Sequence, residues 1–167
     1  MNTINTTKLL QAKAEELNAA PTVSVVDLLT IVLADTYSLT LIAQNAHWNV
    51  EEDFFPLHGV FGDIYDELFG DVDEIAEQIR KLGSYAPANF ALFVEKSGMV
   101  NPSAPQSCEG WIYAILAGYM KMKSDIQALQ SATKSVGLLQ VQNLAIDLEA
   151  KADKKIWMLK SQFKDTD

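Results

Sequence analysis

The chain has 167 residues, of which 49% are hydrophobic, and carries 22 acidic against 13 basic side chains, a formal net charge of −9. This length and composition predict a single domain with enough apolar material for one core. The negative charge disfavours nucleic-acid backbones and favours cations, and no uninterrupted apolar run approaches the roughly 18 residues that a membrane span needs.

The first expected elements are a short N-terminal extension and a long helix. Residues 1–22 form the extension, with a helix at about 5–18, and Pro21 breaks the chain. Ser24, followed three residues later by Asp27, resembles a capping box that opens a helix. We therefore predict a helix over 24–48, which contains neither Gly nor Pro.

Four further helices are expected after a brief turn. Apolar residues spaced three and four apart predict a helix over about 54–82, with Pro56 in its first turn and Gly83 at its end. Residues 84–106 form a long connection with a short helix at about 88–97. The last two helices cover about 107–133 and 138–164, separated at Gly137.

This layout predicts an all-α fold. Two helix pairs with short turns are joined by one long crossover, which is how ferritin-like four-helix bundles are connected. We expect residues 1–167 to form one such domain.

The two histidines of the chain, His47 and His58, fall in one short segment. His47 closes the first long helix and His58 lies in the first turn of the second, so an antiparallel helix pair brings them together. Two imidazoles at one corner are half of a metal site. The alternative is that each is an interfacial or helix-capping histidine, and for this pair alone we leave both interpretations open.

A carboxylate pair follows on the second helix. Asp73 and Glu77 are four residues apart and therefore neighbours on one helix face, flanked by apolar residues. Acids in apolar surroundings are costly unless they are paired or bind metal. The alternative is a solvated acidic face with basic partners, which is how we interpret Asp71 and Glu74.

Geometry separates the two pairs within one chain. His58 and Asp73 are fifteen residues apart, which is about 22 Å along a helix. A two-fold, antiparallel pairing of two second helices would instead place the histidines of one chain beside Asp73 and Glu77 of the other. If these residues bind metal together, the protein is at least a dimer. The ligands suit Fe(II), Mn(II) or Zn(II).

The segment from residue 47 to 83 resembles the signature of the Dps, or mini-ferritin, family. The matching stretches are HWN at 47–49, LH at 57–58 and DEIAE at 73–77, followed by a helix-ending Gly, and ADKKIWMLKSQF near the end resembles the last helix of the family. The resemblance covers about residues 24–164.

This resemblance implies a hollow dodecameric cage with iron as its metal. His47 and His58 of one subunit, with Asp73 and Glu77 of its two-fold mate, would form a ferroxidase centre that oxidises Fe(II) with H₂O₂ or O₂. The cavity would store ferric iron and so protect against oxidative damage. Trp48 would pack beside the centre.

Three departures from the family pattern matter. Gly62 stands where the family has an Asp four residues after the second His, and Asp63 points elsewhere on the helix. The His47–His58 gap is one residue short, and Gln78 replaces an Arg. The pore-lining start of the last helix, Gln140–Asn143, is neutral, which would slow iron entry unless Asp125 or the overall acidity compensates.

Three alternatives therefore remain: a Dps-like structural or metal-binding cage with weakened ferroxidase activity, a DNA-protecting protein, and a helical bundle with no metal role. The N-terminal segment carries only Lys8 and Lys13, and the late lysines alternate with other residues (Lys151, Lys154, Lys155, Lys160 and Lys164). We interpret these lysines as a solvated helix face and expect no DNA binding. We expect a cytoplasmic protein because the opening has no secretory pattern and the lone Cys108 excludes an internal disulfide.

Overall fold

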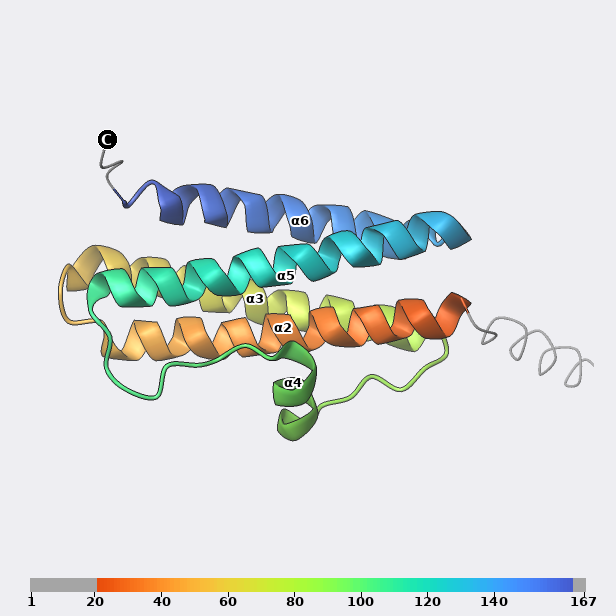
Figure 1. Cartoon of the computed structure of the whole chain (residues 1–167), viewed down its shortest axis with the longest axis horizontal. Helices are drawn as coiled ribbons and strands as arrows, with labels where there is room; N and C mark the ends of the chain where they lie inside the picture. The colour runs from red at the N-terminus through yellow and green to blue at the C-terminus, as the bar shows by residue number, and fades with distance from the viewer. Residues whose placement is uncertain (1–20, 164–167) are drawn as a thin grey trace, which may run out of the picture.

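The computed structural model describes residues 21–163, and these contain five helices and no strand. The expected N-terminal helix at 5–18 and Lys164 lie outside the described residues. The long helices lie side by side, and the short one lies across one of them (Figure 1). Their bounds are α2 Pro21–Asn49, α3 Phe54–Lys81, α4 Phe90–Ser97, α5 Cys108–Val136 and α6 Leu139–Lys160.

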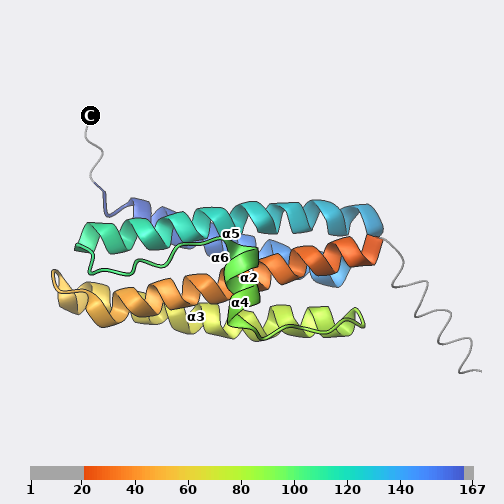
Figure 2. The same cartoon turned by 60° about the horizontal axis from the view of Figure 1, so that its bottom comes forward.

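The connections are those the sequence predicts. Short turns join α2 to α3 and α5 to α6, and residues 82–107 form the long crossover between the pairs. The crossover returns the chain along the bundle, so α3 and α5 run in the same direction (Figure 1). Both views place α4 transverse to the bundle axis and against α2 (Figure 2). The predicted all-α bundle with one long crossover is confirmed.

Most helix ends lie within two residues of the predicted ones, but α2 begins earlier, α5 ends later at Val136 and α6 ends earlier at Lys160. Gly83 and Gly137 adopt left-handed φ angles of 83° and 72° just after α3 and α5, the conformation that favours glycine there. The predicted cap at Ser24 is wrong, because α2 already begins at Pro21. Proline fits a first helical position, since its missing N–H would have no partner there.

The core forms along the helix faces that meet inside the bundle. The largest fully buried side chains come from α2, α3 and α5, and include Leu29, Leu39, Phe61, Ile75, Ile79, Trp111, Tyr119 and Ile126. Helix α6 adds smaller buried residues such as Val141, Ala145 and Leu148. Residues Val25–Asn49 of α2 are long and apolar enough to cross a membrane by length and composition alone. Of the tested window, 56% is buried inside the bundle, as in the core helix of a globular domain.

Helix α4 is fixed to α2 by aromatic contacts. The ring of Tyr37 lies 5.2 Å from that of Phe93 and 5.6 Å from that of Phe90, measured between centroids. Asn89 caps the helix by accepting a hydrogen bond from the Leu92 N–H. The crossover therefore packs against α2 and contributes Phe93 and Ser97 to the interior.

Candidate metal site at the α2–α3 corner

His47 and His58 lie against each other at the corner where α2 ends and α3 begins. Their ring centroids are 3.7 Å apart and their planes differ by 22°. His47 Nδ1 lies 2.7 Å from the main-chain oxygen of His58, and His58 Nδ1 lies 2.9 Å from that of His47. Each histidine thus bonds the backbone of the other.

These two bonds fix the protonation pattern of the neutral rings. A carbonyl oxygen only accepts, so each Nδ1 carries the proton and donates it. The Nε2 atom of each neutral ring then retains its lone pair. Metal-binding histidines commonly have this arrangement, with the second ring N–H donated to a carbonyl or carboxylate. The pair therefore fits a divalent metal ion.

One of these bonds also caps helix α2. The His47 carbonyl lies in the last turn of α2, where carbonyls have no partner within the helix, and the His58 side chain supplies one. The capping interpretation is thus correct for the Nδ1 atom of His58, and this bond does not use its Nε2 atom.

Neighbouring groups hold both rings in place. Phe54 stacks on His58 with centroids 4.6 Å apart, and Tyr65 meets His47 edge-on at 5.2 Å. A Cβ placed on Gly62 would lie 3.2 Å from both Cε1 and Nδ1 of His47. The His47 ring therefore packs directly on the backbone of α3 at Gly62.

The predicted carboxylates lie further along α3 and do not join the histidines within one chain. Asp73 and Glu77 are both exposed, and Glu77 forms an ion pair with Lys81 at 3.1 Å. Among the described residues, no group of three or more His, Cys, Asp or Glu side chains is placed to hold a metal ion. Trp48 beside His47 is 68% exposed.

One face of α3 that the bundle leaves uncovered carries His58, Gly62, Asp73 and Glu77. At 100° per residue, positions 55, 58, 62, 66, 69, 73 and 77 fall within about one third of the helix circumference. Two of them are large apolar side chains that the bundle leaves exposed, Phe55 at 91% and Phe69 at 60%. Exposed apolar side chains grouped on one face indicate an interaction surface.

Two buried carboxylates, Asp35 and Asp71, and the partly exposed Glu67 are already paired with lysines. Asp35 is fully buried and lies 2.9 Å from Lys121 Nζ, and Glu67 lies 2.6 Å from Lys155 Nζ. Asp71 is 5% exposed and bonds Lys151. The prediction of a solvated Asp71 is therefore wrong, although its basic partner was expected.

Burial changes the proton affinity of Asp71 and Asp35. It raises the pKa of Asp71 against the opposing effect of Lys151. It raises the pKa of Asp35 to about 7, assisted by a hydrogen bond with Asp125. For Asp125, burial acts in the same direction but is outweighed by hydrogen bonds with Asp35 and Lys121, so its pKa is lowered. Asp125 is thus engaged with α2 and is not a free pore acid.

The sequence did not single out Asp35 as a site residue. The available signal was a lone acid between the largely apolar stretches 28–34 and 39–43 of a core helix, which demands a partner. The partner, Lys121, is 86 residues further along the chain, so spacing alone did not reveal it.

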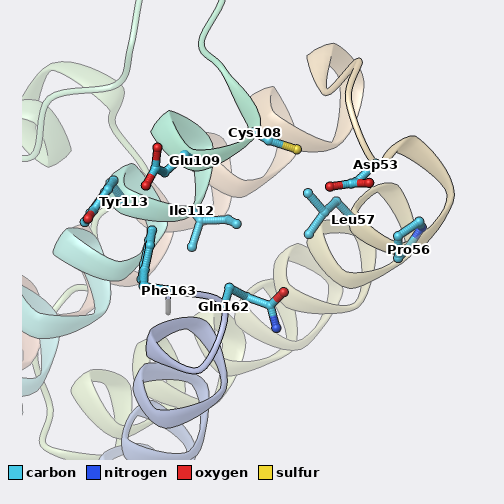
Figure 3. A pocket seen from close by; sticks show the side chains of 9 residues that line it. All are labelled: Asp53, Pro56, Leu57, Cys108, Glu109, Ile112, Tyr113, Gln162 and Phe163. Atoms are coloured by element: carbon cyan, nitrogen blue, oxygen red, sulfur yellow. The ribbon is translucent and has the colours of Figure 1, made fainter. Parts of the chain in front are cut away.

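A cavity of about 530 Å³ lies at the same end of the bundle. Figure 3 shows its lining side chains, which come from the start of α3, the start of α5 and the segment after α6. It includes the carboxylates of Asp53 and Glu109 but no histidine. Cys108 opens α5 beside it and donates from Sγ to the main-chain oxygen of Glu52 at 2.9 Å. The cavity is therefore separate from the histidine pair.

A ferritin-like domain model matches residues 26–167 of the chain. DNA protection during starvation protein 2 from Bacillus anthracis is 27% identical over 138 residues, covering 82% of this chain and 94% of the relative. A DNA protection during starvation protein from Helicobacter pylori is 26% identical over 137 residues, covering 81% and 95%.

Solved structures show the same fold. The crystal structure of CAIP from Helicobacter cinaedi is 29% identical, with a TM-score of 0.79, and covers 84% of this chain and 99% of that one. A Dps protein from Vibrio cholerae, described as a member of a broad superfamily of ferritin-like diiron-carboxylate proteins, aligns with a TM-score of 0.83 at 21% identity, covering 86% and 91%. The predicted ferritin-like architecture is confirmed.

Proposed function

This chain belongs to the ferritin-like family, with Dps proteins as its relatives, and on that premise we propose that it is an iron-binding mini-ferritin. Paired copies would oxidise Fe(II) at shared sites, with H₂O₂ or O₂ as the electron acceptor. The ferric product would be stored inside a hollow cage of twelve copies, which would protect a cytoplasm from oxidative damage.

The observation that carries this proposal is the reciprocal bonding of His47 and His58. Both Nδ1 atoms are occupied by main-chain carbonyls at 2.7 and 2.9 Å, which leaves two Nε2 lone pairs at one half-buried corner. Imidazole nitrogen with carboxylate oxygen is a donor set that suits Fe(II). The capping bonds provide the orientation that a metal ligand needs before the metal arrives.

The uncovered face of α3 supports a site shared between two copies. Asp73 and Glu77 lie on this face together with His58, but about 22 Å of helix separates His58 from Asp73. A two-fold antiparallel pairing brings His58 opposite Asp73 of the mate and creates two equivalent sites. It would also cover the exposed rings of Phe55 and Phe69.

The bundle interior is a poorer candidate for the metal. Asp35, Glu67 and Asp71 each contact a lysine ammonium. A divalent cation would have to displace a positive charge that already neutralises each of these acids. This supports the corner of α2 and α3 as the place where iron binds.

The chemistry needs two electrons for each peroxide. Two Fe(II) ions each give up one electron, and H₂O₂ takes both electrons with two protons to give two water molecules. The protein would bind and orient Fe(II), while the redox step belongs to the metal. The net charge of −9 would attract Fe(II) to the surface.

Gly62 supports a second candidate function, that of a Dps-like cage with weakened ferroxidase activity. The residue offers no ligand atom, and its Cα lies against the His47 ring. DNA protection has less support, because Lys151 and Lys155 are bonded to Asp71 and Glu67 across the bundle and are not free for phosphates.

The proposal is tested by adding H₂O₂ to the assembled protein loaded anaerobically with Fe(II) and following the ferric absorbance. The Asp73→Ala/Glu77→Ala variant should fall to the rate of buffer. Its matched control is Asp63→Ala/Glu74→Ala, which removes two exposed acids from the same helix and should oxidise iron like the wild type. Equal rates in all three proteins and in buffer would favour the weakened cage.

Subunit mixing tests whether the site is shared. A His47→Ala/His58→Ala chain and an Asp73→Ala/Glu77→Ala chain should each be inactive alone. Co-expressed in equal amounts, they form mixed pairs with one intact and one doubly damaged site, which should restore roughly a quarter of the wild-type sites. No recovery, at the same assembled size, would contradict a site built from two copies.

A further inference from the structure

The number of ligands around the histidine pair is limited by Gly62. Its ideal Cβ position lies 3.2 Å from two atoms of the His47 ring, so a side chain at residue 62 would begin in tight contact with the ring. The nearby hollow between α2 and α3, about 270 Å³, holds a single carboxylate, Asp66. Asp66 lies eight residues beyond His58, about 12 Å along the helix.

The mate supplies no replacement ligand at this position. In the antiparallel register that brings His58 opposite Asp73, a residue four positions after His58 faces the residue four positions before Asp73 of the mate. Gly62 would then face Phe69 of the mate. Neither Gly62 nor Phe69 has a side-chain nitrogen or oxygen.

The donor set is therefore two imidazoles from one chain and two carboxylates from the other. Two-metal carboxylate sites in four-helix bundles use six side chains, four carboxylates and two histidines. Four side chains are a sufficient set for a single cation with open positions. They leave a second cation without ligands of its own.

From this geometry, and resting on the proposed function, we infer that each shared site takes one divalent cation rather than two, and that residue 62 sets this number. Gly62 and the exposed ring of Phe69 fill the second position with apolar surface. The site is a one-cation centre built across two chains, with one cation bound for every chain in the assembly.

Anaerobic calorimetric titration with Co(II) measures this number without reference to turnover. Excess Mg²⁺ is included to occupy weak acidic surface sites. The assembled wild type should bind one Co(II) per chain, and the Asp73→Ala/Glu77→Ala variant none. Two Co(II) per chain, both lost in that variant, would overturn the one-cation inference while leaving the shared site intact. No binding, or binding unchanged in that variant, would overturn the site and the inference together.

Two variants at residue 62 test its role. Gly62→Asp adds a carboxylate and should raise the binding above one Co(II) per chain. Gly62→Ala adds only the Cβ, with the same close approach to His47, and should remain at one. Equal stoichiometry in the two variants would overturn the assignment of the limit to residue 62.

Discussion

Leu39 of α2 packs directly onto Gly118 of α5, so that a Cβ at residue 118 would overlap the Leu39 Cδ1 atom. Leu39 is fully buried and cannot move its side chain into solvent. We therefore expect Gly118→Ala to lower the free energy of unfolding by about 1–3 kcal/mol, despite the better helix propensity of Ala, because the two helices would be forced apart. Urea unfolding followed by circular dichroism measures the change.

Gly70→Ala is the matched control for that substitution. Residue 70 is also inside a long helix, but nothing lies within 4 Å of its ideal Cβ. Here the helix propensity acts alone and should raise the free energy of unfolding by roughly 0.5–1 kcal/mol. Changes of the same sign in both variants, at equal assembled size, would contradict the close contact between Leu39 and Gly118.

The buried acid Asp35 should make stability depend on pH. Its pKa is raised to about 7 in the folded protein, against roughly 3.9 for an unfolded aspartate. Between these two values the folded state keeps a proton that the unfolded chain has lost. The contribution of Asp35 to the free energy of unfolding therefore falls as the pH rises through this window and is constant above it. Asp125, whose pKa is lowered, contributes stability that is lost only as pH falls below that range.

Asp35→Asn keeps the shape of the protonated acid and removes its titration. The stability of this variant relative to wild type should therefore rise between about pH 5 and pH 8, by on the order of 1–3 kcal/mol. Thermal or urea unfolding at both pH values measures the difference. Asp27→Asn, an exposed position on the same helix, should show no such rise, and parallel behaviour of the two variants would contradict the buried protonated acid.

The helices could be predicted well because the residues at the breaks between them have distinctive backbone conformations. Gly83 and Gly137 adopt positive φ angles, which other residues reach at a cost, so their positions mark helix ends directly. The start of α2 was misplaced because Pro21 and Ser24 are both typical of helix beginnings and local pattern does not rank them. Periodicity then identified the buried faces without any knowledge of tertiary contacts.

Side-chain pairings between helices that are far apart along the chain could not be predicted from the sequence. Asp71 sits in an acidic run that looks solvated, but Lys151, 80 residues later, bonds it at the α3–α6 interface. The histidine corner was predictable because His47 and His58 are close in sequence across one turn. The other half of the site remains a prediction, since Asp73 and Glu77 meet a histidine pair only through a second copy.

We expect the thiol of Cys108 to react slowly with thiol reagents. Burial, followed by the charges of Asp53 and Glu52, raises its pKa, and its Sγ donates to the Glu52 carbonyl. The thiolate is the reactive form, so at pH 8 the folded protein should react with Ellman's reagent more slowly than the same chain in urea. The Glu52→Gln/Asp53→Asn variant should react faster than wild type. A folded thiol as fast as the unfolded one would contradict this environment.

The capping bond of His58 and its proposed role as a metal ligand can be separated by one pair of substitutions. The amide nitrogen of an asparagine lies as many bonds from Cα as the histidine Nδ1, so His58→Asn can still donate to the His47 carbonyl but lacks an atom at Nε2. Its free energy of unfolding should stay within about 1 kcal/mol of wild type, whereas His58→Ala should lose roughly 1 kcal/mol more because that carbonyl loses its partner. Both variants should lose Co(II) binding in anaerobic titrations. If His58→Asn binds Co(II) as wild type does, His58 is only a cap. If His58→Asn is as unstable as His58→Ala, the main-chain bond does not account for the stability of the corner.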